Sequence, residues 1–512
     1  MPEFLVGSDV GTGGTKSVVM DTSGKVLGEH FIEYPLMTNN LGYAEHDPQW
    51  YWDAMADTIS KAITDSKVDP KNIKGVSVSA LSPACILVDK DLQPLQMGHI
   101  WMDRRSVPQC QWLKDNIGED RIFKLTANPT DPYYAVAKLM WERDNRPDLY
   151  KRAYKMQTAA DYPAMKLTGV AVTDYSNASL CGIAFDVRKK AWDEELLKEI
   201  DIDIEKLPDP YPCEEIIGHV TKEAAERTGL AQGTPVVAGT VDCNAAWVAG
   251  GATEDGDASL VMGTAGVLGI VHKKDSFTKN MIMIVHTANS KETYTTLSAQ
   301  LLGGIYRYYR DQLAAAEKNA AEDLGMDTYD IMGLEAEKIS PGSDGLLLLP
   351  YFLGERTPIW DPYVRGMLFG LSFNHGKGHI IRAIMEGTGY ALRNNFTMIK
   401  SSGIKINLPI VLSEGGARSK LWRQIVCDML EVPVVYMKSF TGAPVGNAIL
   451  AGVGVGVFKD FSVAKKWVEV SDRTEPNPAN TEIYKKYYPI FLELYERNKE
   501  LYEKLAMVRG NY

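Results

Sequence analysis

The sequence predicts an α/β protein with more than one domain. Segments with the composition of strands alternate with segments of helical periodicity from end to end, which is the pattern of the α/β class. The chain has 512 residues, more than one hydrophobic core normally holds, so two or three domains are expected. A plan of strand, glycine turn and strand occurs near the start and again about half a chain later.

Composition and charge narrow the classes of partner. Hydrophobic residues make up 45% and charged residues 24% of the chain, as in a soluble globular protein. The net charge is −11 without a long run of Lys and Arg, which argues against nucleic acid and anionic membranes as partners. The six cysteines include no Cys-x-x-Cys pair, so we expect reduced thiols in a cytoplasmic protein. We expect neither a signal peptide nor a membrane helix, because the chain enters a strand directly and no apolar run approaches roughly 20 residues.

The first two predicted strands enclose a glycine-rich turn, residues 8–17, SDVGTGGTKS. Its glycines permit unusual backbone angles and expose N–H groups, and Thr12 and Lys16 add further donors. Asp9 has the wrong sign to touch a phosphate, but it suits a Mg²⁺ ion that a phosphate also binds. A plain hairpin with an exposed lysine is the alternative, and the Walker A pattern is absent.

A helix is predicted over residues 47–63, where apolar residues recur at helical spacing. Asp47 can cap this helix, and Pro48 fits its first turn. Strands are predicted over 73–80 and 85–95, which are rich in apolar residues.

Two acidic residues further along are candidates for chemistry. Asp242 follows an apolar strand and precedes a helix of small residues in VVAGTVDCNAAWVAGG. An Asp in this place is usually an N-cap, and it can also accept a proton from a hydroxyl that attacks a phosphate. Asp103, in WMDRRS, belongs either to an exposed charge cluster or to a contact with a sugar hydroxyl.

The second half of the chain repeats the opening plan. Residues 259–271, SLVMGTAGVLGIV, read as strand, Gly-Thr turn and strand, with Thr264 in the place of Thr12. A third glycine turn lies in 409–430, between a strand and a helix, where backbone groups favour anionic ligands. Three such turns in two similar halves indicate two domains that close on a shared nucleotide. The alternative is that glycine turns are common in any α/β protein with 44 glycines.

The last segment, 481–505, is predicted to be a helix with an aromatic stripe, and the polar, proline-rich stretch before it a connection. Tyr484, Tyr488, Phe491 and Tyr495 share one face, which is typical of helix packing rather than of a ligand site.

Together these motifs resemble the FGGY family of carbohydrate kinases over nearly the whole chain. The family's phosphate loop, Asp-x-Gly-Thr, is similar to residues 9–12, and its second signature fits 366–386 at every specified position. Its first signature fits only in part, because KLMW at 138–141 matches but Ala135 stands where Pro, Ser or Thr is expected. Three further segments resemble recurring blocks of the family: 173–179, 350–362 and 413–430.

The resemblance implies two actin-like (ribonuclease H-like) ATPase domains of the sugar kinase, Hsp70 and actin superfamily, with an interdomain cleft. We expect an N-terminal domain for sugar and phosphate over 1–250, a nucleotide-binding domain over 251–475 and a helical tail over 476–512. ATP and Mg²⁺ are the implied cofactors.

The resemblance also implies roles for single residues. Asp242 matches the family's general base, and Asp9 is the implied carboxylate associated with Mg²⁺. The residues implied to lie along ATP are Thr12 and Lys16 from the first domain and Thr264, Gly303, Gly415 and Gly416 from the second.

The substrate pocket departs from the family's known patterns. The chain looks most like xylulokinases, yet Leu81 stands about where their histidine falls, and Cys243 follows the base where they place Asn. DPYY, 131–134, is similar to the stretch in which glycerol kinases carry a substrate-contacting Tyr. The candidate substrate contacts are Ser82, Asp103 and Tyr133.

The function that the resemblance implies is ATP-dependent phosphorylation of a small, xylulose-like ketose. One alternative is a polyol kinase of the glycerol or erythritol type. An alternative from another class is a nucleotide-gated binding module of the actin or Hsp70 type, which Asp242 and the FGGY signature disfavour. The expected partner is a small sugar or polyol, with no nucleic acid and no membrane, and a homodimer is an open expectation.

Overall fold

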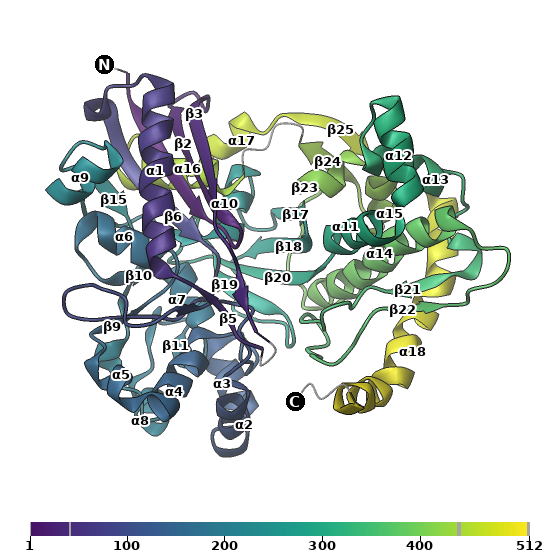
Figure 1. Cartoon of the computed structure of the whole chain (residues 1–512), viewed down its shortest axis with the longest axis horizontal. Coiled ribbons are helices and arrows are strands. Elements are labelled where there is room, and N and C mark those ends of the chain that lie inside the picture. Colours follow the sequence, from purple (N-terminus) through teal and green to yellow (C-terminus); the bar gives the residue numbers. More distant parts are fainter. Residues whose placement is uncertain (1, 40–41, 438–441, 509–512) are drawn as a thin grey trace.

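Two seven-stranded mixed sheets, one in each half of the chain, form the framework of the molecule (Figure 1). The structure, a computed structural model, describes residues 2–39, 42–437 and 442–508. The first sheet has the order β14-β15-β6-β1-β2-β3, and β16 pairs with β6. Its strands are β1 (Phe4–Val10), β2 (Gly14–Asp21), β3 (Val26–Glu33), β6 (Ile73–Ala80), β14 (Ile216–His219), β15 (Pro235–Val237) and β16 (Thr240–Val241).

The second sheet repeats the topology of the first. Its order is β19-β20-β18-β17-β23-β24-β25. Antiparallel β17, β18 and β20 correspond to β1, β2 and β3, and parallel β23 and β24 correspond to β6 and β15. The predicted internal repeat is therefore confirmed. The strands are β17 (Ala258–Met262), β18 (Ala265–His272), β19 (Ile282–Val285), β20 (Tyr294–Leu301), β23 (Ile410–Ser413), β24 (Val434–Met437) and β25 (Val470–Thr474).

Helices and small sheets of two or three short strands surround the two large sheets. The helices of the first half are α1 (Pro48–Ser66), α2 (Val107–Asn116), α3 (Glu119–Thr126), α4 (Ala135–Asn145), α5 (Pro147–Arg152), α6 (Asp161–Thr168), α7 (Tyr175–Cys181), α8 (Glu194–Glu199), α9 (Lys222–Thr228) and α10 (Asp242–Ala249). Those of the second half are α11 (Gly303–Leu313), α12 (Ala315–Leu324), α13 (Thr328–Glu337), α14 (Lys377–Ser401), α15 (Lys420–Leu430), α16 (Ala443–Gly454), α17 (Val463–Trp467) and α18 (Pro478–Val508). The short strands are β4 (Met37–Thr38), β5 (Ala44–His46), β7 (Ile86–Val88), β8 (Gly98–His99), β9 (Lys155–Gln157), β10 (Val172–Asp174), β11 (Phe185–Asp186), β12 (Ala191–Trp192), β13 (Asp209–Tyr211), β21 (Leu347–Leu349) and β22 (Met367–Phe369).

Helices cover both faces of the first sheet. Because side chains alternate along a strand, Val6 and Val10 of β1 pack in the cluster that contains α1, while Leu5 packs in the cluster that contains α16. The helix α1 begins after Asp47, whose carboxylate accepts the Gln49 N–H at 2.9 Å, so the predicted cap is confirmed. The odd-numbered residues of β1, Asp9 among them, thus share the face on which α16 packs.

The chain crosses back to the first sheet near its end. Residues 443–467, which fall inside the predicted second domain, pack instead on the first sheet as α16 and α17 (Figure 1). Their apolar residues join a core with Leu5 and Val237, and sequence order alone does not show this exchange. The approach is close, since a Cβ on Gly7 would lie 1.9 Å from the Pro444 carbonyl oxygen. The first lobe, which is the first sheet with the helices that pack on it, therefore contains elements from both halves of the chain. The second lobe is the second sheet with its helices.

Gly446 in α16 provides a test of this packing. A Cβ there would lie 1.8 Å from the carbonyl oxygen of Ala245 in α10, so Gly446→Ala must separate two helix backbones. We expect a loss of about 1–3 kcal/mol in the free energy of unfolding. The matched control is Gly333→Ala in α13, where a Cβ meets nothing within 4 Å; it should gain up to about 1 kcal/mol from helix propensity. Calorimetric unfolding of both variants measures the difference, and equal stabilities would contradict the close packing.

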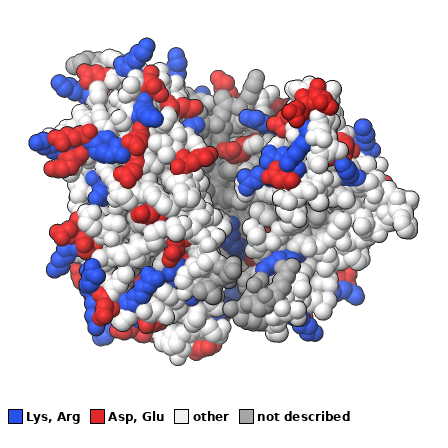
Figure 2. Space-filling view, in the orientation of Figure 1, with Lys and Arg blue, Asp and Glu red and all other residues white. Residues whose placement is uncertain are grey.

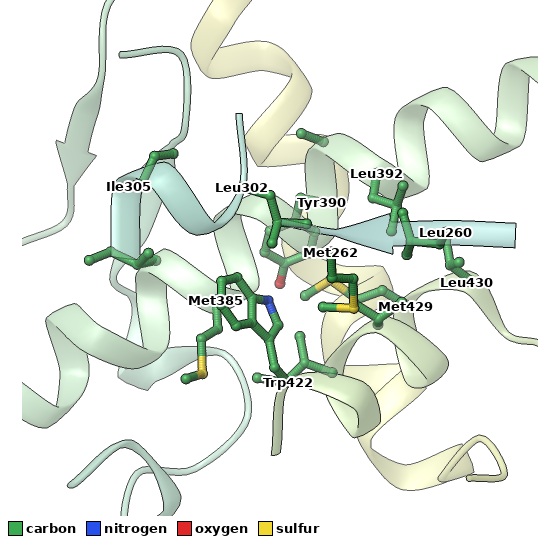
Figure 3. Close-up of a cluster of buried hydrophobic side chains, with 14 of the residues drawn as sticks. Leu260, Met262, Leu302, Ile305, Met385, Tyr390, Leu392, Trp422, Met429 and Leu430 are labelled. Carbon is green, nitrogen blue, oxygen red and sulfur yellow. The ribbon is translucent and has the colours of Figure 1, made fainter. Parts of the chain in front are cut away.

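The second lobe has its own hydrophobic core between its sheet and helices α14, α15 and α18. Figure 3 shows Met262 of β17, Tyr390 of α14 and Trp422 of α15 in this core. The C-terminal helix α18 adds Tyr484 and Phe491, both buried, so the predicted packing role of its aromatic stripe is confirmed. The stretch before α18 was expected to be a connection, but part of it forms the edge strand β25.

Acidic and basic side chains are interspersed over both lobes on the face in Figure 2, and the surface is hollowed between the lobes. All six cysteines are free thiols. None of the described helices has the length and apolar character needed to cross a membrane.

Candidate active site

Two carboxylates lie at one edge of the first sheet. Asp9 on β1 pairs in register with Ser79 on β6, and Ser79 also pairs with Thr240 on β16. These three strands are parallel, so their carboxyl ends meet at the same edge. Asp242 comes directly after β16 and opens helix α10. The sheet thereby places Asp9 and Asp242, 233 positions apart in the chain, at the same edge and close enough for their charges to interact.

Asp242 is not the cap of its helix. Val241 occupies the cap position, and Asp242 is the first helical residue, with its carboxylate accepting the Cys243 N–H at 2.6 Å. Desolvation, followed by the nearby charge of Asp9, raises the pKa of Asp242 to about 7. A carboxylate with this pKa can take up a proton near neutral pH, which is the property a general base needs.

Asp9 is fixed by a relay of hydrogen bonds. The Ser79 hydroxyl donates to its carboxylate at 2.6 Å, and the side-chain amide of Asn447 in α16 donates to the Ser79 oxygen at 2.7 Å. The same amide group donates to the Ser8 carbonyl, also at 2.7 Å. Desolvation raises the pKa of Asp9 to about 6 even though the Ser79 bond lowers it.

The donor set at this edge fits Mg²⁺. Carboxylate and hydroxyl oxygens are the ligands that Mg²⁺ prefers, and this ion usually takes one or two protein carboxylates together with phosphates and water. Within the described ranges, no group of three or more His, Cys, Asp and Glu side chains is placed to hold a metal. Asp9, with Asp242 beside it, therefore fits a metal that a bound phosphate chain helps to hold.

The glycine turn between β1 and β2 lies beside these carboxylates. It is closed by a bond from the Gly11 N–H to the Gly14 carbonyl at 2.9 Å, and the Thr12 hydroxyl accepts the indole N–H of Trp101 at 3.1 Å. Lys16, the register partner of Asp9, is paired with Glu29 at 2.9 Å. Thr12 is partly exposed, so its hydroxyl can be reached by a ligand. Lys16 must leave Glu29, or share its charge with it, to bind a phosphate.

The three predicted nucleotide segments of the second half meet at one edge of the second sheet. Gly303 donates its N–H to the Gly263 carbonyl at 3.0 Å, which places it against the turn that carries Thr264. A Cβ on Gly416 would lie 2.9 Å from the Met262 carbonyl oxygen, so this turn also touches β17. Thr264 and Gly415 are exposed. The residues of the second half that are expected along a nucleotide therefore lie together at this edge.

Two of the three substrate candidates lie together. The Tyr133 hydroxyl donates to the Ser82 carbonyl at 3.0 Å, and the Ser82 hydroxyl is buried without a hydrogen-bond partner in the described part of the chain. A buried hydroxyl without a partner is costly unless a ligand satisfies it.

Asp103 does not join them. It is fully buried, and both of its carboxylate oxygens accept internal bonds, from the Ala44 N–H and from Arg105. The cluster expected to be exposed is instead an internal ion pair, so Asp103 has no oxygen left for a sugar. The local motif WMDRRS could not show this, because Ala44 comes from a distant strand.

Trp101 and Arg356 were not predicted as site residues. The Arg356 guanidinium lies 4.9 Å from the centre of a Trp101 ring and 5.6 Å from that of Tyr133. Trp101 is the first residue of the motif that contains Asp103, and Arg356 lies in the 350–362 segment that resembles the family. Both residues therefore belong to segments already identified in the sequence as candidates.

Two lobes of repeated topology, each with a glycine turn at the edge of its sheet, are the architecture of the actin-like ATPase class. The chain belongs to the FGGY family of carbohydrate kinases: the family's N-terminal domain matches residues 4–249 and its C-terminal domain matches residues 258–455. The predicted family and fold class are thus confirmed, and the protein is a carbohydrate kinase, that is, a phosphotransferase.

Relatives with named activities cover the whole chain. The gluconokinase of Bacillus subtilis (strain 168) is 30% identical over 506 residues, 99% of this chain and 98% of that protein. The xylulose kinase of the same organism is 28% identical over 512 residues, 99% of this chain and 100% of that protein. The crystal structure of gluconate kinase from Lactobacillus acidophilus superposes with a TM-score of 0.89 at 25% identity, covering 99% of this chain and 100% of that one.

Proposed function

We propose that the protein transfers the γ-phosphoryl group of ATP to a hydroxyl of a small, xylulose-like ketose, with Asp242 as the general base. The observation that carries this proposal is the carboxylate of Asp242, raised in pKa to about 7 at the edge of the sheet beside Asp9 and the glycine turn. Asp242 takes the proton from the hydroxyl as the new O–P bond forms and the bond to the leaving ADP oxygen breaks.

The other groups have supporting roles in the proposal. Thr12 and Lys16 on one lobe, with Thr264 on the other, bind the phosphates, and Gly303, Gly415 and Gly416 line the nucleotide. Asp9 holds Mg²⁺, which neutralises charge on the phosphates when bound. Ser82 and Tyr133 contact the sugar. The six free thiols and a requirement for ATP fit a reducing compartment, so we propose the cytoplasm as its location.

A substrate panel tests the proposal. ADP release is measured with ketoses, aldoses, polyols and the sugar acid gluconate, because relatives include a gluconokinase as well as xylulose kinases. Strong turnover with one sugar and little without it is expected. Turnover that no sugar stimulates would contradict the kinase proposal and favour a nucleotide-gated module.

The unpartnered Ser82 hydroxyl predicts a specific effect on sugar binding. Ser82→Ala should raise KM for the best sugar by about 3–10-fold, as for the loss of one neutral hydrogen bond, and leave KM for ATP nearly unchanged. Steady-state kinetics on the best sugar of the panel measure both constants. A KM for the sugar equal to that of the wild type would remove Ser82 from the proposed pocket.

The raised pKa of Asp242 predicts the pH dependence of turnover. The base form is present above about pH 7 and is lost as the pH falls, so kcat/KM for the sugar should be about 10-fold lower at pH 6 than on the plateau. A pH series of kcat/KM measures this decline. A profile that stays flat down to pH 5 would mean that Asp242 does not titrate in this range.

A further inference from the structure

An arginine of the second lobe reaches the candidate site without a partner of opposite charge. The guanidinium of Arg356 contacts the rings of Trp101 and Tyr133, and within the described residues no carboxylate lies within 4.0 Å of it. The neighbouring arginines are paired: Arg104 binds Asp131 and Arg105 binds Asp103. The ring contacts leave the charge of this partly buried guanidinium without a counter-ion, and a guanidinium is well suited to bind phosphate or carboxylate oxygens.

The loop that carries Arg356 is held firmly to the second sheet. Glu355 and Asp361 exchange two backbone hydrogen bonds of 2.9 Å across the loop. The Thr357 hydroxyl accepts the Ala299 N–H of β20, also at 2.9 Å. Arg356 must therefore move together with the second lobe when the two lobes move relative to each other.

The adjacent acid, Glu355, forms no ion pair with this arginine. Glu355 is buried, and desolvation raises its pKa to about 8 even though the backbone bond to Arg356 and the charge of Arg356 lower it. Its carboxyl group accepts the backbone N–H of Arg356 at 2.8 Å rather than the guanidinium. The charge of Arg356 is thus available to a ligand.

The two aromatic contacts locate this charge within the site. Trp101 donates its indole N–H to Thr12 in the phosphate turn. Tyr133 binds the Ser82 carbonyl, and burial raises the pKa of its hydroxyl. The charge of Arg356 lowers this pKa and that of Asp242 raises it further, so both charges lie near Tyr133. Arg356 therefore lies between the turn that faces the phosphates and the groups that face the sugar.

We propose that Arg356 contacts the phosphoryl group during its transfer and stabilises the charge on its oxygens. The inference rests on the proposed function, in which the γ-phosphoryl group of ATP passes to the sugar hydroxyl, ADP leaves and the hydroxyl proton passes to Asp242. A guanidinium presents several N–H donors in one plane and so matches the equatorial oxygens of the group in transit. Because Arg356 belongs to the second lobe, closure of the lobes completes the site.

The test compares Arg356→Met with Arg356→Lys. Met should lower kcat by about 10²–10³ with every accepted sugar, neutral or acidic, and change KM for the sugar by less than about 3-fold. Lys keeps the charge but not the planar donors, so it should recover part of kcat. The matched control is Arg365→Met on the same loop, whose guanidinium, among the residues that the structure describes, donates only to the Pro362 and Val364 carbonyls; its kcat should equal that of the wild type.

Two outcomes overturn the inference. A variant Arg356→Met with unchanged kcat means that the guanidinium does not touch the reacting group. A rise in KM confined to gluconate, with kcat retained, means that Arg356 binds a carboxylate of the sugar instead.

A binding measurement keeps this test separate from the proposed function. Calorimetry compares ADP with ADP plus aluminium fluoride, which mimics the phosphoryl group in transit. Arg356→Met should weaken the binding of ADP plus aluminium fluoride by about 10-fold or more and leave the binding of ADP alone unchanged. If no sugar is phosphorylated but this difference appears, the proposed function fails while the anion contact stands. Equal affinities of wild type and variant for the mimic overturn the contact.

Discussion

Asp242→Asn should abolish most turnover and leave the fold intact. The amide has nearly the same shape but cannot accept the proton, and a positioned base contributes about 10²–10⁴-fold to the rate, so kcat should fall by that factor. Stability should not fall, because the charge of Asp9 opposes the charge of Asp242 and the variant removes this repulsion. Stopped assays with the best sugar measure kcat, and thermal unfolding measures stability.

The control for Asp242→Asn is an aspartate that does cap a helix. Asp193 accepts the Leu196 N–H at 2.8 Å at the start of α8, and Asn is an equally good cap. Asp193→Asn should therefore change neither kcat nor stability. Calorimetric titration should show that Asp242→Asn still binds ADP. A value of kcat above about half that of the wild type would leave Asp242 without a role as base.

Local sequence patterns were sufficient to predict the strands, turns and helix that form the framework of the site. The turns around Thr12 and Thr264 could be predicted because a glycine turn between two strands is encoded by adjacent residues. The strand and helix that flank Asp242 could be predicted for the same reason, because adjacent residues encode each of them. Their meeting at one sheet edge follows once the strands are parallel, a feature that the alternation of strands and helices predicts.

Contacts between distant segments could not be predicted in the same way. Asp103 looks exposed in its motif, yet Ala44 from β5 and its neighbour Arg105 enclose it. Asn447 reaches Ser79 across 368 positions because α16 returns to the first sheet. Arg356 contacts Trp101 and Tyr133 only because its loop faces the opposite lobe. In each case the sequence identifies the residue type, and the topology decides its partner.

An ion pair is buried in the second lobe, and its loss is expected to destabilise the protein strongly. Arg382 and Glu386, one turn apart on α14 and both nearly inaccessible, are joined at 2.8 Å. Glu386 also accepts bonds from the Gly342 N–H and the Ser343 hydroxyl, and the Tyr484 hydroxyl of α18 bonds to both members of the pair. This part of the FGGY signature therefore ties α14 to α18 rather than contacting a substrate.

Arg382→Met should cost about 3–5 kcal/mol in the free energy of unfolding, because it leaves a buried carboxylate without its cation. Desolvation already raises the pKa of Glu386, and loss of Arg382 removes a cause that lowers it. The folded variant then holds a proton that the unfolded chain releases above about pH 4.3, so its stability falls as the pH rises.

The loss in the free energy of unfolding that Arg382→Met causes relative to wild type should accordingly be larger at pH 8 than at pH 5. The double variant Arg382→Met/Glu386→Gln should recover part of this loss at pH 8. The exposed pair of Arg497 and Glu493 on α18 provides the control, since Arg497→Met should cost no more than about 1 kcal/mol. Calorimetry at the two pH values, with hydrogen exchange of α14, measures the effect. A deficit that is equal at both pH values would show that Arg382 stabilises the lobe through packing alone, because only the unpaired Glu386 carboxylate makes the loss depend on protons.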